Sequence, residues 1–132
     1  LVNYLAERGI EHIPSWLREV HFEHVLTGKH YYGLGIQNVT GAWNVRNSYG
    51  KYVVLENLEQ GQSYSLIKRG KSNKKIVVVE GLFDALTLEE IAKGDYYDIA
   101  VLNSVNNLNK FLNDRILEQY EAIILALDND EE

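Results

Sequence analysis

From residue 75 onward the sequence alternates short apolar runs with segments of helical spacing, and this alternation limits the possible folds more than any other feature. The first run, residues 76–79, is continuously β-branched, as in strands that are buried on both faces. The predicted strands are residues 76–79, 99–102 and 122–127, and the predicted helices are residues 84–93, ended by Gly94, and about 108–120. Strands and helices in this order predict a parallel βαβαβ sheet with right-handed crossovers.

The N-terminal half has a different pattern. Residues 1–8 are typical of a short amphipathic helix ended by Gly9, and Pro14 followed by residues 15–19 favours the first turn of another helix. Residues 31–36 and 43–47 alternate apolar with small or polar residues and predict an antiparallel hairpin. Residues 52–55 and 64–67 could extend its sheet. We therefore predict a small α+β subdomain over residues 1–74 and an α/β domain over residues 75–132.

Composition narrows the class of protein. The chain has no cysteine, so it has no disulfide framework and no thiolate zinc site. It has no apolar run of the roughly 18 residues that a membrane span needs and no signal-peptide pattern, which favours a cytoplasmic protein without a membrane partner. The net charge of −6 argues against a simple electrostatic nucleic-acid binder. However, residues 1–75 carry ten basic and six acidic side chains, whereas residues 76–132 carry three and thirteen.

Acidic residues follow the first and third predicted strands. Glu80 ends the first strand, with Asp84 one helical turn later, and Asp128 and Asp130 follow the third. Ligands of open parallel sheets bind beyond the carboxyl ends of the strands, so we expect these four carboxylates to meet at one edge. Their mutual repulsion favours a bound cation, and Mg²⁺, or Mn²⁺ in its place, prefers such oxygen ligands.

Taken singly, each acidic position also has an ordinary structural explanation. Glu80 could be a solvated residue at a strand end, Asp84 could stabilise a helix N-terminus, and the Asp-X-Asp segment could be a turn or cap. The four histidines lack a cysteine or an acidic partner in register and do not predict a metal site. The two tryptophans favour core positions over base stacking.

Two segments resemble the motifs of TOPRIM domains. Residues 77–86, Val-Val-Val-Glu-Gly-Leu-Phe-Asp-Ala-Leu, resemble the first motif, and residues 123–130, Ile-Ile-Leu-Ala-Leu-Asp-Asn-Asp, resemble the Asp-X-Asp motif. TOPRIM domains occur in bacterial-type primases, topoisomerases and several nucleases. The resemblance implies that Glu80, Asp128 and Asp130 are catalytic and hold one or two Mg²⁺ ions, with Asp84 also at the metal site.

The N-terminal half resembles the catalytic core of primases. Residues 4–10, Tyr-Leu-Ala-Glu-Arg-Gly-Ile, resemble the segment that opens this core, and residues 35–47 resemble its hairpin, with Arg46 as the basic residue near template or nucleotide. After Arg46 the expected Pro-Lys loop is replaced by Tyr-Gly-Lys-Tyr, which makes Lys51 a second candidate for a phosphate contact. Lys68 and Arg69, in a basic run, are further candidates, although a solvated loop explains them equally well.

The resemblance as a whole is to divergent primases of phages and mobile elements. It implies RNA primer synthesis on a single-stranded DNA template from nucleoside triphosphates, with a replicative helicase as a further partner. The alternatives are a TOPRIM-type Mg²⁺-dependent nuclease and a non-catalytic receiver-like α/β module. Because the chain starts without methionine and stops after a strand, we expect a fragment of a longer protein, with an incomplete TOPRIM domain that is inactive alone.

Overall fold

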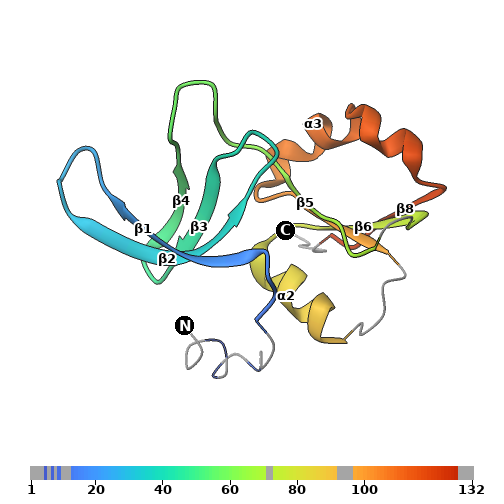
Figure 1. The fold of residues 1–132 in the computed structure, drawn as a ribbon, viewed down its shortest axis with the longest axis horizontal. Coiled ribbons are helices and arrows are strands. Elements are labelled where there is room, and N and C mark those ends of the chain that lie inside the picture. Colours follow the sequence, from blue (N-terminus) through green and yellow to red (C-terminus); the bar gives the residue numbers. More distant parts are fainter. Residues whose placement is uncertain are drawn as a thin grey trace, which may run out of the picture. The chain divides into compact units, whose positions relative to one another are not determined.

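The structure is a computed structural model that describes residues 5, 7, 9, 13–70, 73–91 and 97–127. The chain divides into two compact units, Leu1–Gln62 and Ser63–Glu132, and each contains a four-stranded sheet (Figure 1). We name these sheet A, in the first unit, and sheet B, in the second. Within the described ranges no helix has the length and apolar character needed to cross a membrane.

Sheet A is an antiparallel meander in the order β1-β2-β3-β4. Its strands are β1 (Leu17–Glu23), β2 (His30–Gln37), β3 (Trp43–Asn47) and β4 (Gly50–Val54). The predicted hairpin is confirmed as β2 and β3, with Gln37 opposite Trp43 at its closed end. Buried Asn38 fixes the turn between them, because its side-chain oxygen accepts hydrogen bonds from the backbone N–H and the hydroxyl of Thr40.

The helix predicted over residues 15–19 was wrong. Only a single turn forms there, in which the Leu17 N–H donates to the Pro14 carbonyl at 3.2 Å, and β1 then starts at Leu17. Pro14 suits a turn as well as a helix start, and pairing with β2 outweighs the weak local helix preference. Of the helix predicted over residues 1–8, only Leu5 and Glu7 are described, and both are helical. Gly9 has a φ of +80°, as a helix-ending glycine needs.

Two glycines in β2 let neighbouring side chains close over one face of sheet A. A Cβ atom at Gly33 would lie 2.6 Å from the Arg46 carbonyl oxygen, and one at Gly35 would overlap Val20 Cγ2. Both approaches are closer than van der Waals contact. Side chains from β1 and β3 therefore occupy the space above β2 that side chains at Gly33 and Gly35 would otherwise fill.

We predict that Gly33→Ala lowers the free energy of unfolding of the first unit by about 1–3 kcal/mol, because the new methyl group would force backbone atoms of β3 to move. Both tryptophans, Trp16 and Trp43, belong to this unit, so urea titration followed by tryptophan fluorescence reports its unfolding. Gly61→Ala is the matched control, since nothing lies within 4 Å of its added Cβ. Equal stability of the two variants would contradict the packing argument.

Sheet B contains the strands β5 (Ser65–Ile67), β6 (Lys75–Val79), β7 (Asp98–Val101) and β8 (Ala122–Leu125), in the order β5-β7-β6-β8. β6 pairs in parallel with both β7 and β8, whereas β5 is antiparallel to β7. The helical segments are α2 (Leu82–Ile91), η1 (Val105–Asn107), α3 (Leu108–Leu112) and η2 (Arg115–Gln119). The three strands that the sequence predicted pair in parallel, whereas the antiparallel edge strand β5 makes this a mixed α/β unit.

Two predicted elements of this region need correction. The segment that includes β5 was expected to extend the first sheet, but it forms an edge strand of sheet B, with Ser65 opposite Val101. The single helix predicted over residues 108–120 is broken at Asn113 and Asp114. Asp114 has an extended backbone, and its carboxylate caps η2 by accepting a hydrogen bond from the Ile116 N–H at 2.9 Å. Short polar side chains favour such caps over helix interiors.

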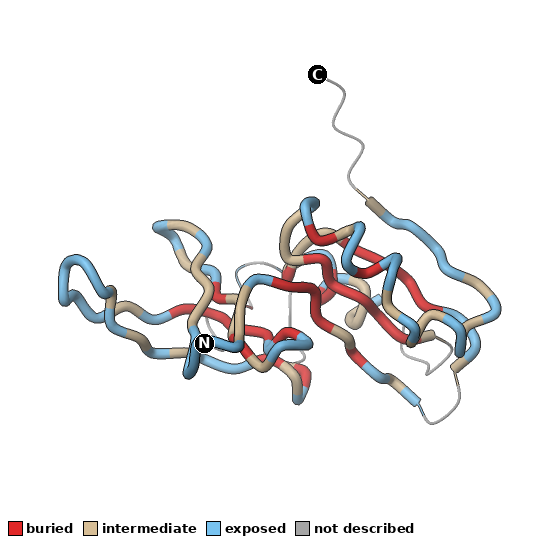
Figure 2. Tube along the Cα trace, turned by 90° about the horizontal axis from the view of Figure 1, so that it is seen from above, coloured by how far each residue is buried: buried red, intermediate tan, exposed pale blue. Residues whose placement is uncertain are grey.

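The core of the second unit lies on both faces of β6 and β7. β7 is buried along its whole length, and β6 is buried from Ile76 onward (Figure 2). Figure 1 shows α2 on one side of sheet B and α3 on the other. On the α3 side a cluster of buried side chains forms: Tyr64, Ile76, Val78, Ala100, Leu102 and Phe111. Burial on both faces explains why these strands are continuously apolar.

A buried carboxylate lies at the amino end of β7. Asp98 is only 2% exposed. One of its oxygens accepts hydrogen bonds from the Arg69 backbone N–H and the Asn73 side chain, both at 2.9 Å. The other accepts from the Tyr120 hydroxyl at 2.6 Å and lies 3.5 Å from the Lys68 ammonium group. Lys68 also donates to the Tyr120 oxygen at 2.9 Å, so this network ties the segments before β6 and β8 to the start of β7.

These contacts set the charge states of the network. Burial alone would raise the pKa of Asp98, but the hydrogen bonds from Tyr120, Arg69 and Asn73, together with the charge of Lys68, outweigh it and hold that pKa below its ordinary value. Burial, and then the bond to Asp98, raise the pKa of Tyr120. The bond to Tyr120 is the main factor that raises the pKa of Lys68. At neutral pH Asp98 is therefore ionised while Tyr120 stays protonated.

We predict that Tyr120→Phe lowers the free energy of unfolding by about 1–2 kcal/mol at pH 7, because buried Asp98 loses a hydrogen-bond donor. A lowered native pKa stabilises the fold above the unfolded value of about 4, and this contribution is lost as the pH falls through the native pKa. The deficit of the variant should therefore shrink below about pH 4. Urea titrations at pH 7 and pH 3, with Tyr49→Phe as the control, measure this, and a deficit that does not change with pH would contradict it.

Candidate functional site

The parallel strands of sheet B end together at one edge. Val79, the last residue of β6, is level with Val101, the last residue of β7. The pairing of β8 with β6 extends one residue beyond β8, because the Ala126 N–H donates to the Val78 carbonyl at 2.8 Å. Ligands of open α/β sheets bind beyond this edge, so the residues that follow these strands form the candidate site.

Leu127 brings the chain to the level of Glu80. The register of β6 and β8 pairs Lys75 with Ala122 and Val78 with Leu125, and its continuation sets Leu127 opposite Glu80. Leu127 also packs against the buried cluster on the α3 side. The next predicted ligands, Asp128 and Asp130, lie outside the described residues. The structure therefore brings the last described residue before them to the Glu80 edge.

Glu80 is half-buried at the end of β6. The hydrogen-bond ladder between β6 and β7 continues beyond the last residues of both strands, because Leu102 N–H donates to the Val79 carbonyl and Asn103 N–H donates to the Glu80 carbonyl, both at 2.9 Å. The backbone of Glu80 is therefore held on the side of β7. A backbone fixed in this way limits the positions that the carboxylate can reach.

Asp84 lies in the first turn of α2 and is exposed. One of its carboxylate oxygens accepts a hydrogen bond from the Gly81 N–H at 3.2 Å. An acid that bonds back to the residue before the helix stabilises the helix N-terminus, which is the structural explanation that the sequence left open. This contact keeps the carboxylate close to the turn that follows Glu80.

Among the described residues no three histidine, aspartate or glutamate side chains gather closely enough to hold a metal ion. Two of the four predicted ligands are outside that set, so the complete ligand group of Glu80, Asp84, Asp128 and Asp130 stays a prediction.

Comparison with known families gives two matches. Residues 1–54 match a family described as a domain of unknown function (DUF8464), a span that ends with β4. Residues 77–132 match a family described as Toprim-like, which begins within β6. The second match supports a TOPRIM domain. Neither the curated proteins nor the solved structures contain a match to the chain.

A TOPRIM domain implies a metal-dependent role in nucleotidyl transfer or nucleic-acid cleavage. Such domains are usually found in enzymes that act on nucleic acids, and they typically bind Mg²⁺. In this chain the first and third of the predicted strands, β6 and β8, end at the same edge of sheet B.

Asn103 lies beside Glu80 at the edge where the parallel strands of sheet B end, and the sequence pattern did not predict a role for it. It has a φ of +67°, in the left-handed region that asparagine tolerates better than most residues. Its side-chain amide donates to the Ser63 carbonyl and to the Ser65 hydroxyl, both at 2.9 Å, while its backbone N–H holds Glu80. Asn103 therefore ties β5 to the end of β6. An asparagine directly after a buried strand was the only signal in the sequence.

The four predicted phosphate-contact residues fall into two groups. Arg46 and Lys51 are cross-strand partners in sheet A, so their exposed side chains lie on the same face. Lys68 and Arg69 belong to the second unit. Lys68 contacts Asp98 and Tyr120, and the Arg69 guanidinium lies 3.6 Å from the Glu89 carboxylate and 5.2 Å from the ring centre of Tyr97.

We predict that Asn103→Gly lowers the free energy of unfolding by about 1–3 kcal/mol, because two hydrogen bonds to the start of β5 are lost while the backbone stays unstrained. Asn103→Ala should cost about 1 kcal/mol more, since alanine resists a positive φ. Urea titration followed by far-ultraviolet circular dichroism measures both. If the alanine variant were as stable as the glycine variant, the left-handed backbone would carry no strain.

Proposed function

We propose that this chain is part of the catalytic core of a DNA primase, which uses Mg²⁺ to join nucleotides into RNA primers on single-stranded DNA. The observation that carries the proposal is the parallel register of β6 and β8, which sets Glu80 opposite Leu127, directly before Asp128 and Asp130. The match of residues 77–132 to the Toprim-like family supports metal-dependent chemistry at this edge.

The residues at the edge fit a divalent cation by their chemistry. Glu80, Asp128 and Asp130 offer only oxygen donors, which Mg²⁺ prefers, and Asp84 is held close by through Gly81. Two carboxylates about 4 Å apart repel by about 4 kcal/mol at the effective dielectric of a protein surface, and a cation between them removes this cost. When bound, Mg²⁺ would neutralise triphosphate charge and lower the pKa of an attacking 3′-hydroxyl.

The chain's own residues have separate tasks in this proposal. Glu80, Asp128 and Asp130 hold the cation, and Asn103 positions the backbone of Glu80. Arg46 and Lys51, side by side in sheet A, contact phosphates of template or nucleotide. Lys68 and Arg69 are weaker candidates for this task, because their contacts with Asp98 and Glu89 serve the fold of the second unit.

The resemblance of residues 4–10 and 35–47 to the opening segments of primases favours primer synthesis over cleavage. A TOPRIM-type nuclease would use the same carboxylates but would release nucleotides from DNA instead of incorporating them. The two activities therefore separate in a single assay with labelled nucleotides and labelled DNA.

The activity test uses a protein that contains the complete TOPRIM domain. There we predict that Glu80→Gln lowers Mg²⁺-dependent incorporation of ribonucleotides on a single-stranded DNA template at least about 100-fold, because an amide cannot replace the carboxylate charge beside the cation. Glu118→Gln, an exposed position in η2 before the start of β8, is the matched control and should keep full activity. Incorporation that survives Glu80→Gln would contradict the assignment, and DNA cleavage without incorporation would replace primase by nuclease.

Metal binding has its own readout, which does not depend on activity. Paramagnetic Mn²⁺ broadens the NMR signals of nearby amides, so in the 132-residue chain the amides of Gly81, Asn103 and Leu127 should broaden first. The same titration of Glu80→Gln should need at least about ten times more Mn²⁺. Broadening centred elsewhere would remove the metal site from this edge.

A further inference from the structure

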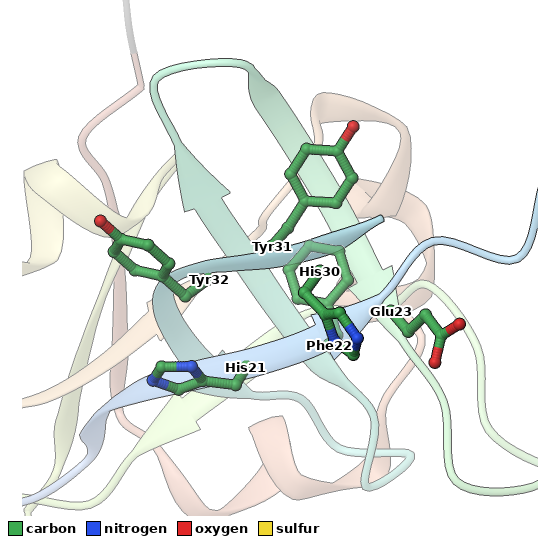
Figure 3. Close-up of a pocket in the computed structure, with 6 residues that line it drawn as sticks. All are labelled: His21, Phe22, Glu23, His30, Tyr31 and Tyr32. Atoms are coloured by element: carbon green, nitrogen blue, oxygen red, sulfur yellow. The ribbon is translucent and has the colours of Figure 1, made fainter. Parts of the chain in front are cut away.

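Two aromatic side chains on the β1–β2 hairpin form an exposed stack. His21 and Tyr32 are cross-strand partners, and their rings lie 5.6 Å apart between centres at an interplanar angle of 23°. Tyr32 is 63% exposed and the His21 side chain 69%. Figure 3 shows both on one side of the hairpin, whereas Tyr31 points away from them. Six residues line an open hollow of about 290 Å³ at this position: His21, Phe22, Glu23, His30, Tyr31 and Tyr32.

The opposite face of sheet A already has an aromatic cluster that serves packing. There Tyr31 stacks on Phe22 and Tyr52, with ring centres 5.8 Å apart in both pairs, and Tyr49 meets Tyr31 edge-on. Phe22, Tyr31 and Tyr52 are each partly buried. On the face that carries His21 and Tyr32, Leu34 and Ile36 are buried, whereas Tyr32 is exposed and stacks on His21. Packing therefore accounts for the two aliphatic side chains but does not explain a large exposed ring at position 32.

Two cations lie on the same face as Tyr32. Leu34, two residues further along β2, is opposite Arg46, and Arg46 is opposite Lys51. Side chains two residues apart on a strand share a face, so Tyr32, Arg46 and Lys51 point to the same side. Tyr32 and Arg46 are diagonal neighbours, about 7–8 Å apart at the backbone. A ring and a cation at this separation suit the base and the phosphate of a nucleotide.

Charge is distributed unevenly across this face. The acidic residues, Glu19 and Glu23, lie on β1, whereas the basic residues, Arg46 and Lys51, lie on β3 and β4. Glu19 lies 3.4 Å from the His21 ring nitrogen, on the β1 side of the stack. A polyanion would therefore place its phosphates toward β3 and β4 and its bases toward β1 and β2.

We propose that this face of sheet A binds single-stranded nucleic acid, with a base stacked on Tyr32 and its phosphates on Arg46 and Lys51. Exposed aromatic rings beside a basic track are the usual means of holding single strands, since every base has a face that can stack. The choice of a single-stranded DNA ligand rests on the proposed primase function. The arrangement of rings and charges on sheet A does not depend on the metal site proposed in sheet B.

The test is binding of a fluorescein-labelled oligo(dT) to the 132-residue chain without added metal, measured by anisotropy. Tyr32→Ala should weaken binding about 5- to 100-fold, whereas Tyr32→Phe should stay within about twofold of the unchanged chain, because stacking needs the ring and not the hydroxyl. Tyr49→Ala is the matched control, since Tyr49 is 79% exposed and contacts the cluster on the opposite face. Circular dichroism confirms that each variant is folded.

Two further measurements complete the test. Arg46→Gln and Lys51→Gln should each reduce the slope of log affinity against log salt by about 0.7, the value for one lost phosphate contact on a single strand. In the unchanged chain, an oligonucleotide with 5-iodouracil should crosslink on irradiation to Tyr32 or His21, as read by peptide mass spectrometry. This readout needs no substitution and stays valid if Tyr32→Ala does not fold.

The outcomes separate this inference from the proposed function. The inference would be overturned by normal binding of Tyr32→Ala, by crosslinks at other residues, or by no binding of oligo(dT). If oligo(dT) does not bind, a protein partner becomes the better candidate for this face. In the 132-residue chain, Glu80→Gln should bind the oligonucleotide as tightly as the unchanged chain. Binding that depends on Tyr32, together with no incorporation by a protein that contains the complete TOPRIM domain, would support the nucleic-acid face and reject the primase.

Discussion

The parallel pairing of β6 with β7 on one side and β8 on the other is the interaction on which the second unit depends. Parallel neighbours end at the same edge, and so Glu80, Asn103 and Leu127 reach one place from distant parts of the chain. Burial keeps this register in place. Ile76 and Val78 face the α3 side while Val77 and Val79 face the other, and a slip by one residue would exchange the two sets. The same packing that stabilises the sheet therefore positions the candidate site.

The strands of this fold could be predicted where burial leaves a clear pattern, and the errors occurred where tertiary pairing decides. β6 and β7 are mostly buried and apolar, whereas β8 is equally apolar although most of it is exposed, and each was predicted within one or two residues of its limits. Part of β1 was predicted to be helical, because its residues have a weak local helix preference and show no clear strand periodicity. In the structure, pairing with β2 outweighs that preference. The segment of β5 reads equally well as a strand of either sheet, and only its pairing with β7 assigns it.

The candidate site was predictable to a similar degree. Glu80 follows a recognisable strand, whereas the role of Asn103 depends on a left-handed backbone and on partners about 40 residues earlier in the chain. Charge was misleading in one respect. Divided at the structural boundary, the first unit has five basic and six acidic side chains and the second has eight and thirteen. The basic excess of residues 1–75 therefore comes from residues 68–75, which belong to the second unit. The positions of Arg46 and Lys51 on one face of sheet A are therefore more informative about nucleic-acid binding than the net charge of the unit.

Acidic residues lie at both ends of the parallel strands of sheet B. At the amino end, the protein itself supplies every partner that Asp98 needs, from the Tyr120 hydroxyl to the Lys68 ammonium group. At the carboxyl end, Glu80 directly follows β6 and is the first residue of the predicted metal site. The contacts that keep Asp98 ionised are therefore about one strand length away from the predicted metal site. Substitutions at Lys68 or Tyr120 change the tolerance of this unit to acid without altering the residues at the opposite edge of the sheet.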